Sequence, residues 1–162
     1  IRFVHNPFYR TGNASSLLSA EGALRGEESF LLAMSDHIFE RKIVESAIDR
    51  YTGEPLLCVD EKPTYAVDID DATKVLVNED GYIEDIGKAI PVWTAIDTGV
   101  FHLNTDLFRI VRGGAPAVVS DCIKILAERS RLMACDVSGS MWFDVDTMED
   151  LELAERVMDE WG

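Results

Sequence analysis

The chain has 162 residues, of which 47% are hydrophobic and 28% are charged, so it has enough apolar material for one packed core and predicts a single domain over residues 1–162. Thirty acidic and fifteen basic side chains give a formal charge of −15, which excludes nucleic acid as a favoured partner. No apolar run is long enough for a membrane helix and the first ten residues do not resemble a signal peptide, so we expect a cytoplasmic chain without a membrane segment.

In the first half of the chain, the spacing of apolar residues predicts alternating strands and helices. We predict a strand at 2–5 (RFVH), a helix over 14–26, and a strand at 29–34 (SFLLAM) of the apolar kind that is buried on both faces of a parallel sheet. An amphipathic helix is expected over 40–51, and a second buried strand over 55–60.

In the second half, Asp80-Gly81 predicts a β-hairpin within residues 73–87. The remaining expected elements are a strand at 94–103, helices at 106–111 and 118–130, strands at 132–137 and 142–145, and a last helix at 148–161 that Asp146 or Thr147 caps. Alternating strands and helices predict an α/β fold with three α-β-α layers and a mostly parallel, Rossmann-like sheet that carries the inserted hairpin.

Acidic side chains follow two of the predicted strands. Asp36 comes just after the strand at 29–34, and Asp144 and Asp146 lie in or just after the strand that begins at Trp142. In open α/β sheets ligands bind beyond the carboxyl ends of the strands, and two carboxylates there can share one Mg²⁺ while leaving most of its shell to phosphate and water. The alternative is that these acids only form turns, and that Asp146 only caps the last helix.

Three segments, in a fixed order, carry a family resemblance. They are TGNASSLL (11–18), MSDH (34–37) and WFDVDTMEDL (142–151), with a block of the form TKV…DGYIEDIGK…DTGVF between the last two. Together they resemble the MobA-like nucleotidyltransferases, which join a nucleoside triphosphate to a sugar phosphate or a similar phosphorylated alcohol. Within this family the sequence is most similar to the CTP:inositol-1-phosphate cytidylyltransferases, and the match covers essentially the whole chain.

The resemblance implies a magnesium site with a lysine nearby. Asp36 and Asp144 match the two metal-ligand positions, and Asp146 is either a further acid of that site or only the helix cap. Lys88 matches the lysine that meets the phosphate of the acceptor, so the implied catalytic residues are Asp36, Asp144 and Lys88.

The resemblance also implies two substrate regions. In family members a turn approaches the nucleotide, and in this sequence the matching residues are Gly12, Asn13, Ala14 and Ser15. A plain helix-capping turn explains Asn13 equally well. In family members another set of positions binds the acceptor, and in this sequence the matching residues are Lys74, Asp97, Thr98 and Gly99. The carboxylate of Asp97, in the middle of a strand, suits a polyol because it can accept hydrogen bonds from two neighbouring hydroxyls.

One part of the family pattern is missing from the sequence. Family members begin with a strand and a glycine-rich loop, G-x-G-T-R followed by P-K, which cradle the triphosphate. We therefore expect the first strand and this loop to come from a segment outside the chain, and we expect the chain alone to be inactive.

The implied reaction is the Mg²⁺-dependent joining of CTP and inositol 1-phosphate to give CDP-inositol and pyrophosphate. The acceptor phosphate oxygen would attack the α-phosphorus in line, so positioning and charge neutralisation matter more than acid–base chemistry. A sugar 1-phosphate or phosphocholine could replace inositol 1-phosphate, and a non-catalytic domain of the same fold is the alternative from another class.

Overall fold

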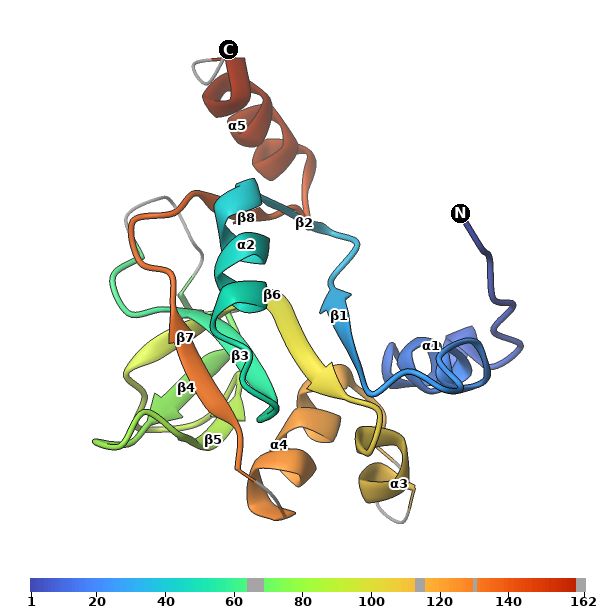
Figure 1. The fold of residues 1–162 in the computed structure, drawn as a ribbon. Coiled ribbons are helices and arrows are strands. Elements are labelled where there is room, and N and C mark those ends of the chain that lie inside the picture. The colour runs from blue at the N-terminus through green and yellow to red at the C-terminus, as the bar shows by residue number, and fades with distance from the viewer. Residues whose placement is uncertain (64–68, 113–115, 130, 160–162) are drawn as a thin grey trace.

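The computed structural model describes residues 1–63, 69–112, 116–129 and 131–159 (Figure 1). Its strands are β1 (Ser29–Ala33), β2 (His37–Phe39), β3 (Leu56–Asp60), β4 (Lys74–Val77), β5 (Ile83–Gly87), β6 (Ala95–Asn104), β7 (Met133–Asp136) and β8 (Trp142–Asp144). Its helices are α1 (Ala14–Ser19), α2 (Arg41–Asp49), α3 (Leu107–Val111), α4 (Val119–Arg129) and α5 (Met148–Asp159), with 3-10 turns at Tyr9–Thr11 and Glu21–Ala23. None of these helices is both long enough and apolar enough to cross a membrane.

The long strand β6 is the centre of the main sheet. It pairs with β3 along one edge, and β3 pairs in turn with β7. Its other edge is shared by β1, which pairs with residues 100–104, and by β4, which pairs with residues 95–96 and carries β5 as its hairpin partner. β1 and β4 therefore part from the same edge of β6, and residues 97–99 lie between them.

The prediction of a mostly parallel sheet was wrong for the strand pairs. Among the pairs in the described residues, β3 with β7 is parallel, whereas β6 runs antiparallel to β1, β3 and β4. Apolar runs indicate burial of a strand and not its direction. The sheet is mixed, within the predicted α/β class.

The predicted three layers are present. Alternate residues of β3 face opposite sides of the sheet, as the pleat of a strand requires. Leu57 and Val59 pack in one apolar cluster with α1, α3 and α4, and Leu56 and Cys58 pack in a second cluster with α2. Figure 1 shows α2 against the sheet and α5 projecting beyond β8.

Two predicted strands differ from the structure. Residues 2–5 form no strand but an exposed arm, in which the side chain of Phe3 is 90% exposed. The strand at 29–34 exists as β1, but it is not buried on both faces, because Leu31 is 41% exposed and Ala33, on the same face, is exposed as well. The apolar run thus identified the strand and overestimated its burial.

The other predicted elements are present with shifted ends. The helix at 14–26 is shorter, since α1 ends at Ser19 and a 3-10 turn follows. The hairpin closes at Gly81, whose φ of 82° suits the turn. Ser130 and residues 160–161, which were included in predicted helices, lie outside the described residues.

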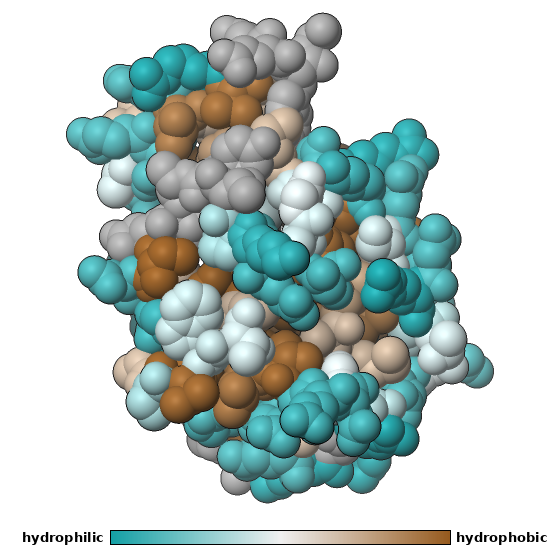
Figure 2. All heavy atoms as spheres, turned by 90° about the vertical axis from the view of Figure 1, so that its left-hand side faces the viewer, coloured by the Kyte–Doolittle hydropathy of each residue, from teal (hydrophilic) through white to brown (hydrophobic). Residues whose placement is uncertain are grey.

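The surface matches the acidic composition. Figure 2 shows that hydrophilic side chains cover much of the face that lies on the left of Figure 1, with smaller apolar patches between them. Apolar area on a protein surface is normal when it is divided in this way.

The turn before α1 is packed closely against the segment that leads into α4. Gly12 has φ 118° and ψ 161°, a conformation that glycine adopts almost alone, and a Cβ there would overlap the carbonyl oxygen of Ala117. The N–H of Ala14 donates to the same oxygen at 3.2 Å, and Oδ1 of Asn13 accepts the N–H of Val119 at 2.8 Å. Gly12 is therefore required for this close approach.

We expect Gly12→Ala to destabilise the protein by about 3 kcal/mol, since the new methyl group meets backbone that cannot move away without breaking these bonds. Urea unfolding followed by circular dichroism measures this loss. Gly26→Ala is the matched control, because Gly26 also has a positive φ of 97° but has open space around it, and about 1 kcal/mol is expected there. Equal losses in the two variants would contradict the steric explanation.

Candidate metal and phosphate site

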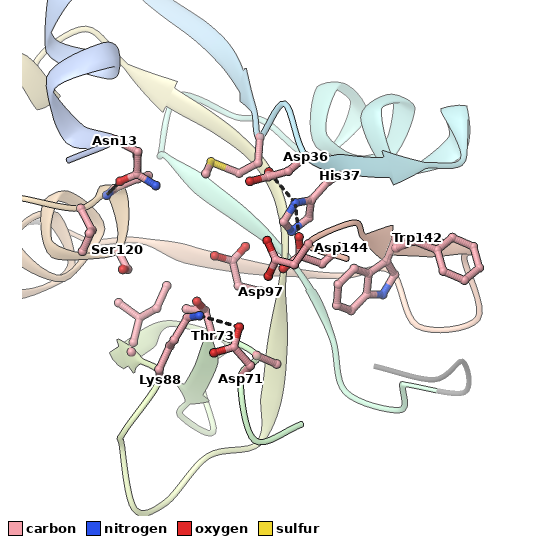
Figure 3. Close-up of a pocket in the computed structure, with 18 of the residues that line it drawn as sticks. Asn13, Asp36, His37, Asp71, Thr73, Lys88, Asp97, Ser120, Trp142 and Asp144 are labelled. Atoms are coloured by element: carbon pink, nitrogen blue, oxygen red, sulfur yellow. Dashed lines mark hydrogen bonds and ion pairs between the residues drawn. The ribbon is translucent and has the colours of Figure 1, made fainter. Parts of the chain in front are cut away.

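A small second sheet brings the two predicted metal ligands together. β2 and β8 pair antiparallel, with His37 opposite Asp144. The N–H of Val145 donates to the carbonyl oxygen of Asp36 at 2.9 Å, which extends this pairing by one residue. Asp36 and Asp144 are more than a hundred residues apart in the sequence, and strand pairing places their carboxylates at one point (Figure 3).

The side chain of His37 lies between the two carboxylates. Its Nδ1 is 3.0 Å from Oδ1 of Asp36 and 3.5 Å from Oδ1 of Asp144, and the side chain is 11% exposed. Sequence reasoning gave His37 no role in binding or catalysis, although it follows Asp36 directly. The structure therefore adds an imidazole to the predicted pair of acids.

The donor groups fit a divalent cation. Asp36, His37 and Asp144 each offer one ligand atom, and these atoms all lie within 4.8 Å of one another. The side chains of Asp36 and Asp144 are 45% and 41% exposed, so an ion between them can also bind water or phosphate oxygens. Carboxylate oxygens are the protein ligands that Mg²⁺ prefers, and Mg²⁺ usually takes one or two of them together with substrate phosphates.

Asp146 is close to this cluster but outside it. It lines the same cavity, and its charge helps to raise the pKa of Asp144. The cap of α5 is formed instead by Thr147 and Asp150, since Asp150 accepts the N–H of Thr147 at 2.8 Å and donates its own N–H to Oγ1 of Thr147. Asp146 therefore keeps its carboxylate available, and its role as a metal ligand remains a prediction.

Burial perturbs two carboxyl groups of the site. Burial raises the pKa of Asp144, and the neighbouring acids Asp146 and Asp36 raise it further, while His37 opposes them. Burial also raises the pKa of Asp97 to about 6, although the N–H of Gly99 donates to Asp97 Oδ1 at 2.7 Å and favours the charged form. Negative charge is thus costly here without a cation, which supports the predicted need for a divalent ion.

A cavity of about 940 Å³ connects these groups with the rest of the predicted site. This is near the upper end of the usual range for small-molecule sites. Figure 3 shows Asp36, His37 and Asp144 turned toward one another, with Asp97 beside them. Lys88 and Asp71 lie on another wall, and Asn13 and Ser120 lie at a third place around the opening.

The two predicted lysines differ in position. Lys88 lines the cavity, and its Nζ donates to Oδ2 of Asp71 at 2.8 Å, which raises the pKa of Lys88. Lys74 is not among the residues that line the cavity. Its Nζ donates instead to the carbonyl oxygens of Asp70 and Lys88, at 3.4 and 3.1 Å. Lys74 therefore supports the segment that carries Lys88.

The predicted nucleotide-binding turn reaches the cavity through one side chain. Asn13 lines the cavity, whereas Gly12, Ala14 and Ser15 do not. Ala14 is fully buried, and the hydroxyl of Ser15 donates to the carbonyl oxygen of Gly12 at 2.7 Å. Asn13 also uses Oδ1 to cap α4, so the alternative of a capping turn is confirmed for that atom, and contact of the turn with a nucleotide remains a prediction.

Of the three predicted acceptor residues in β6, Asp97 lines the cavity. Thr98 is fully buried, and its hydroxyl donates to the carbonyl oxygen of Cys58 at 2.9 Å. Gly99 lies against the ring of His37, where a Cβ would come within 2.5 Å of Cδ2. In this structure, then, Thr98 and Gly99 have packing roles, and their contact with an acceptor remains a prediction.

Several polar residues of the cavity were not predicted. They are Asp71, Thr73, Ser120, Asp121 and Lys124. Asp71 precedes a predicted strand and Ser120 begins a predicted helix, and these positions could have been recognised as sites where loops meet a crevice. Lys124 pairs with Asp85 at 2.7 Å, and this pair lowers the pKa of Asp85.

The sequence is similar to known transferases. It is 35% identical over 166 residues to the bifunctional IPC transferase and DIPP synthase of Rubrobacter xylanophilus, and 36% identical over 154 residues to that of Thermococcus kodakarensis. These alignments cover 100% and 94% of this chain but 37% and 34% of those proteins, so the chain spans about a third of the curated relatives that it matches. No family model matches the sequence.

Solved structures share the fold. The inositol-1-phosphate CTP transferase from T. maritima superimposes with a TM-score of 0.79 and 25% identity, over 90% of this chain and 60% of that chain. A UDP-glucose pyrophosphorylase complexed with UDP-glucose gives a TM-score of 0.74 at 17% identity, over 94% of this chain and 64% of that chain. The predicted nucleotidyltransferase fold and the resemblance to inositol-1-phosphate cytidylyltransferases are therefore confirmed.

The contact between Gly99 and His37 leads to a first prediction for the site. We expect Gly99→Ala to destabilise the protein by about 3 kcal/mol, because a methyl group displaces the imidazole and also strains a residue with φ 76°. Thermal and urea unfolding measure this loss.

Two further variants isolate the contact between these residues. Gly139→Ala carries a similar backbone strain, with φ 81°, but has open space around it, and should cost about 1 kcal/mol. The double variant Gly99→Ala/His37→Ala should recover part of the loss, since the ring that meets the methyl group is gone. Purely additive losses would contradict the packing role of Gly99.

The raised pKa of Asp97 leads to a second prediction. Between about pH 4 and pH 6 the folded protein keeps a proton on Asp97 that the unfolded chain has released, so this residue lowers stability as the pH rises through that window. In chelator-treated protein, Asp97→Asn should therefore gain about 2 kcal/mol relative to the wild type between pH 4 and pH 7.5. Urea unfolding at both pH values tests this, and a difference that does not change with pH would contradict it.

Proposed function

We propose that this chain, which has a nucleotidyltransferase fold and is similar to one segment of the IPC transferase and DIPP synthases, is the larger part of a domain that joins CTP and inositol 1-phosphate to give CDP-inositol and pyrophosphate. The observation that carries the proposal is the meeting of Asp36 and Asp144 in one cavity with Lys88 on another wall. A donor that is a nucleoside triphosphate also fits the expected cytoplasmic location. The proposed reaction is that of a Mg²⁺-dependent cytidylyltransferase.

Repulsion between negative charges opposes substrate binding at this site. The reacting groups are phosphates, and the cavity is lined by Asp36, Asp97, Asp144 and Asp146 among other acids. A bound Mg²⁺ would neutralise phosphate charge and align the two substrates. Asp36 and Asp144 are proposed to hold that ion, because their carboxylates converge and remain accessible.

Lys88 is proposed to bind the phosphate of the acceptor. Its ammonium group pairs with Asp71, and both side chains are more than half exposed, with values of 59% and 55%. An exposed ion pair of this kind contributes about 1 kcal/mol or less, so a phosphate dianion can replace the carboxylate as the partner of the lysine. Lys74 would act indirectly, through its bond to the carbonyl oxygen of Lys88.

Asp97 is proposed to bind hydroxyl groups of the acceptor. Its carboxyl group lines the cavity at the place where β1 and β4 part from β6. A carboxylate there can accept hydrogen bonds from two neighbouring hydroxyls of a polyol. This favours inositol 1-phosphate over phosphocholine, whose headgroup offers no hydroxyl.

The nucleotide is proposed to lie toward Asn13 and Ser120. Both line the cavity, and they are positioned by the contact between the turn at 12–15 and the start of α4. Gly12, Ala14 and Ser15 would act by fixing this turn. The transfer itself is proposed to proceed in line without a general base, because the attacking phosphate oxygen is already anionic.

A pyrophosphate-release assay with CTP and Mg²⁺ tests the function. Inositol 1-phosphate should give the highest rate, above a sugar 1-phosphate and phosphocholine, and Asp144→Asn should lower the rate by about a hundredfold or more. The assay uses the polypeptide translated from the complete gene, since the chain spans about a third of its curated relatives, and this chain by itself is expected to release little or no pyrophosphate.

Asp49→Asn is the control, because Asp49 is exposed on α2 and does not line the cavity. It should keep the wild-type rate. A higher rate with another acceptor would replace inositol 1-phosphate in the proposal. No pyrophosphate release with any acceptor, combined with CTP binding that does not depend on Mg²⁺, would favour a non-catalytic domain of the same fold.

A further inference from the structure

The three histidines of the chain have different surroundings. Both ring nitrogens of His102 have partners, the carbonyl oxygen of Ala47 and the hydroxyl of Ser29, each at 3.1 Å. His5 lies on the exposed amino-terminal arm. The ring of His37, by contrast, points into the group of Asp36 and Asp144 at the centre of the proposed site (Figure 3).

The distances at His37 match those between ligands of one metal ion. Protein nitrogen and oxygen ligands lie about 2.1 Å from a small divalent ion, so two adjacent ligands of an octahedral ion are about 3.0 Å apart and two of a tetrahedral ion about 3.4 Å apart. Nδ1 of His37 is 3.0 Å from Oδ1 of Asp36 and 3.5 Å from Oδ1 of Asp144. Nδ1 of His37 is therefore spaced from each carboxylate as a ligand of a shared ion would be, and the three donor atoms all lie within 4.8 Å of one another.

The ring of His37 has two further neighbours. One side lies against Gly99, where no side chain intervenes. The ring is stacked with Trp142, with centroids 6.1 Å apart and planes 11° apart. Trp142 in turn donates its indole N–H to Oδ2 of Asp60 at 3.0 Å, and Asp60 is 3% exposed. These neighbours limit the orientations that the imidazole can adopt.

We infer that His37 is a third protein ligand of the divalent ion, through Nδ1, and that the site has a mixed donor set of two carboxylates and one imidazole. The inference rests on the proposed function, because it concerns the same ion. Imidazole is a better ligand for first-row transition ions than for Mg²⁺, which prefers oxygen. The site should therefore bind Mn²⁺ more tightly than Mg²⁺, and His37 should be the source of that selectivity.

The alternative role for His37 is to donate a hydrogen bond to Asp36 and orient that carboxylate without binding the ion. The same 3.0 Å separation fits that bond. The two roles of His37 differ in one property that can be measured directly. A ligand places a nitrogen nucleus in the coordination shell of the ion, whereas an orienting hydrogen bond does not.

Pulsed electron paramagnetic resonance of protein loaded with Mn²⁺ alone makes this measurement. We expect modulation of the electron spin echo by one directly bound ¹⁴N nucleus in the wild type. Labelling the histidines of the wild-type chain with ¹⁵N should change that modulation, which identifies the residue type without any substitution.

Two variants then assign the residue. His37→Ala should lose the nitrogen signal and bind Mn²⁺ at least about tenfold more weakly, with a smaller loss for Mg²⁺, since removal of a supporting group alone commonly costs about 10- to 100-fold in metal affinity. His5→Ala should keep both the signal and the affinity. Calorimetric titration with each ion gives the affinities.

The possible failures are distinguishable. If Mn²⁺ binds to the wild type without a nitrogen signal, and binds more weakly to Asp144→Asn, His37 is not a ligand but the proposed carboxylate site stands. A nitrogen signal that persists in His37→Ala would also overturn it. Mn²⁺ binding that is unchanged in Asp144→Asn would overturn both this inference and the metal site of the proposed function.

Discussion

The pairing of β2 with β8 is the constraint on which the site depends. Three residue pairs fix two carboxylates at one point, although like charges at this distance repel each other and burial raises the pKa of Asp144. The strands hold Asp36 and Asp144 together against this repulsion, and the ring of His37 lies between them. The fold thus maintains an arrangement of acids that a cation would relieve, which is how preorganised ion sites work.

Local patterns in the sequence were sufficient for most of the fold. Strands and helices follow from apolar spacing, the hairpin from Asp80-Gly81, and the cap of α5 from Thr147 and its partner three residues later. The direction of β6 did not follow, because apolar runs are the same in parallel and antiparallel strands. The shared edge of β6, where β1 and β4 part, depends on contacts between distant segments and so left no local signal.

The candidate site was predictable in part for the same reason. Asp36 and Asp144 were recognisable because each stands at the end of an apolar run and within a segment that resembles a known family, which are properties of neighbouring residues. The position of His37 between them depends on the register of β2 with β8 and on the absence of a side chain at Gly99. Likewise, the partnership of Lys88 with Asp71 joins two separate loops. Such relations arise only when the chain has folded.

The separation of β2 and β8 along the sequence has a consequence for biosynthesis. Translation runs from the amino terminus, and domains generally fold as units as they emerge. Asp36 and His37 are made more than a hundred residues before Asp144. A nascent polypeptide therefore lacks one acid of the candidate site until β8 has been made, and a product of translation interrupted between β2 and β8 would carry Asp36 without the strand that positions it.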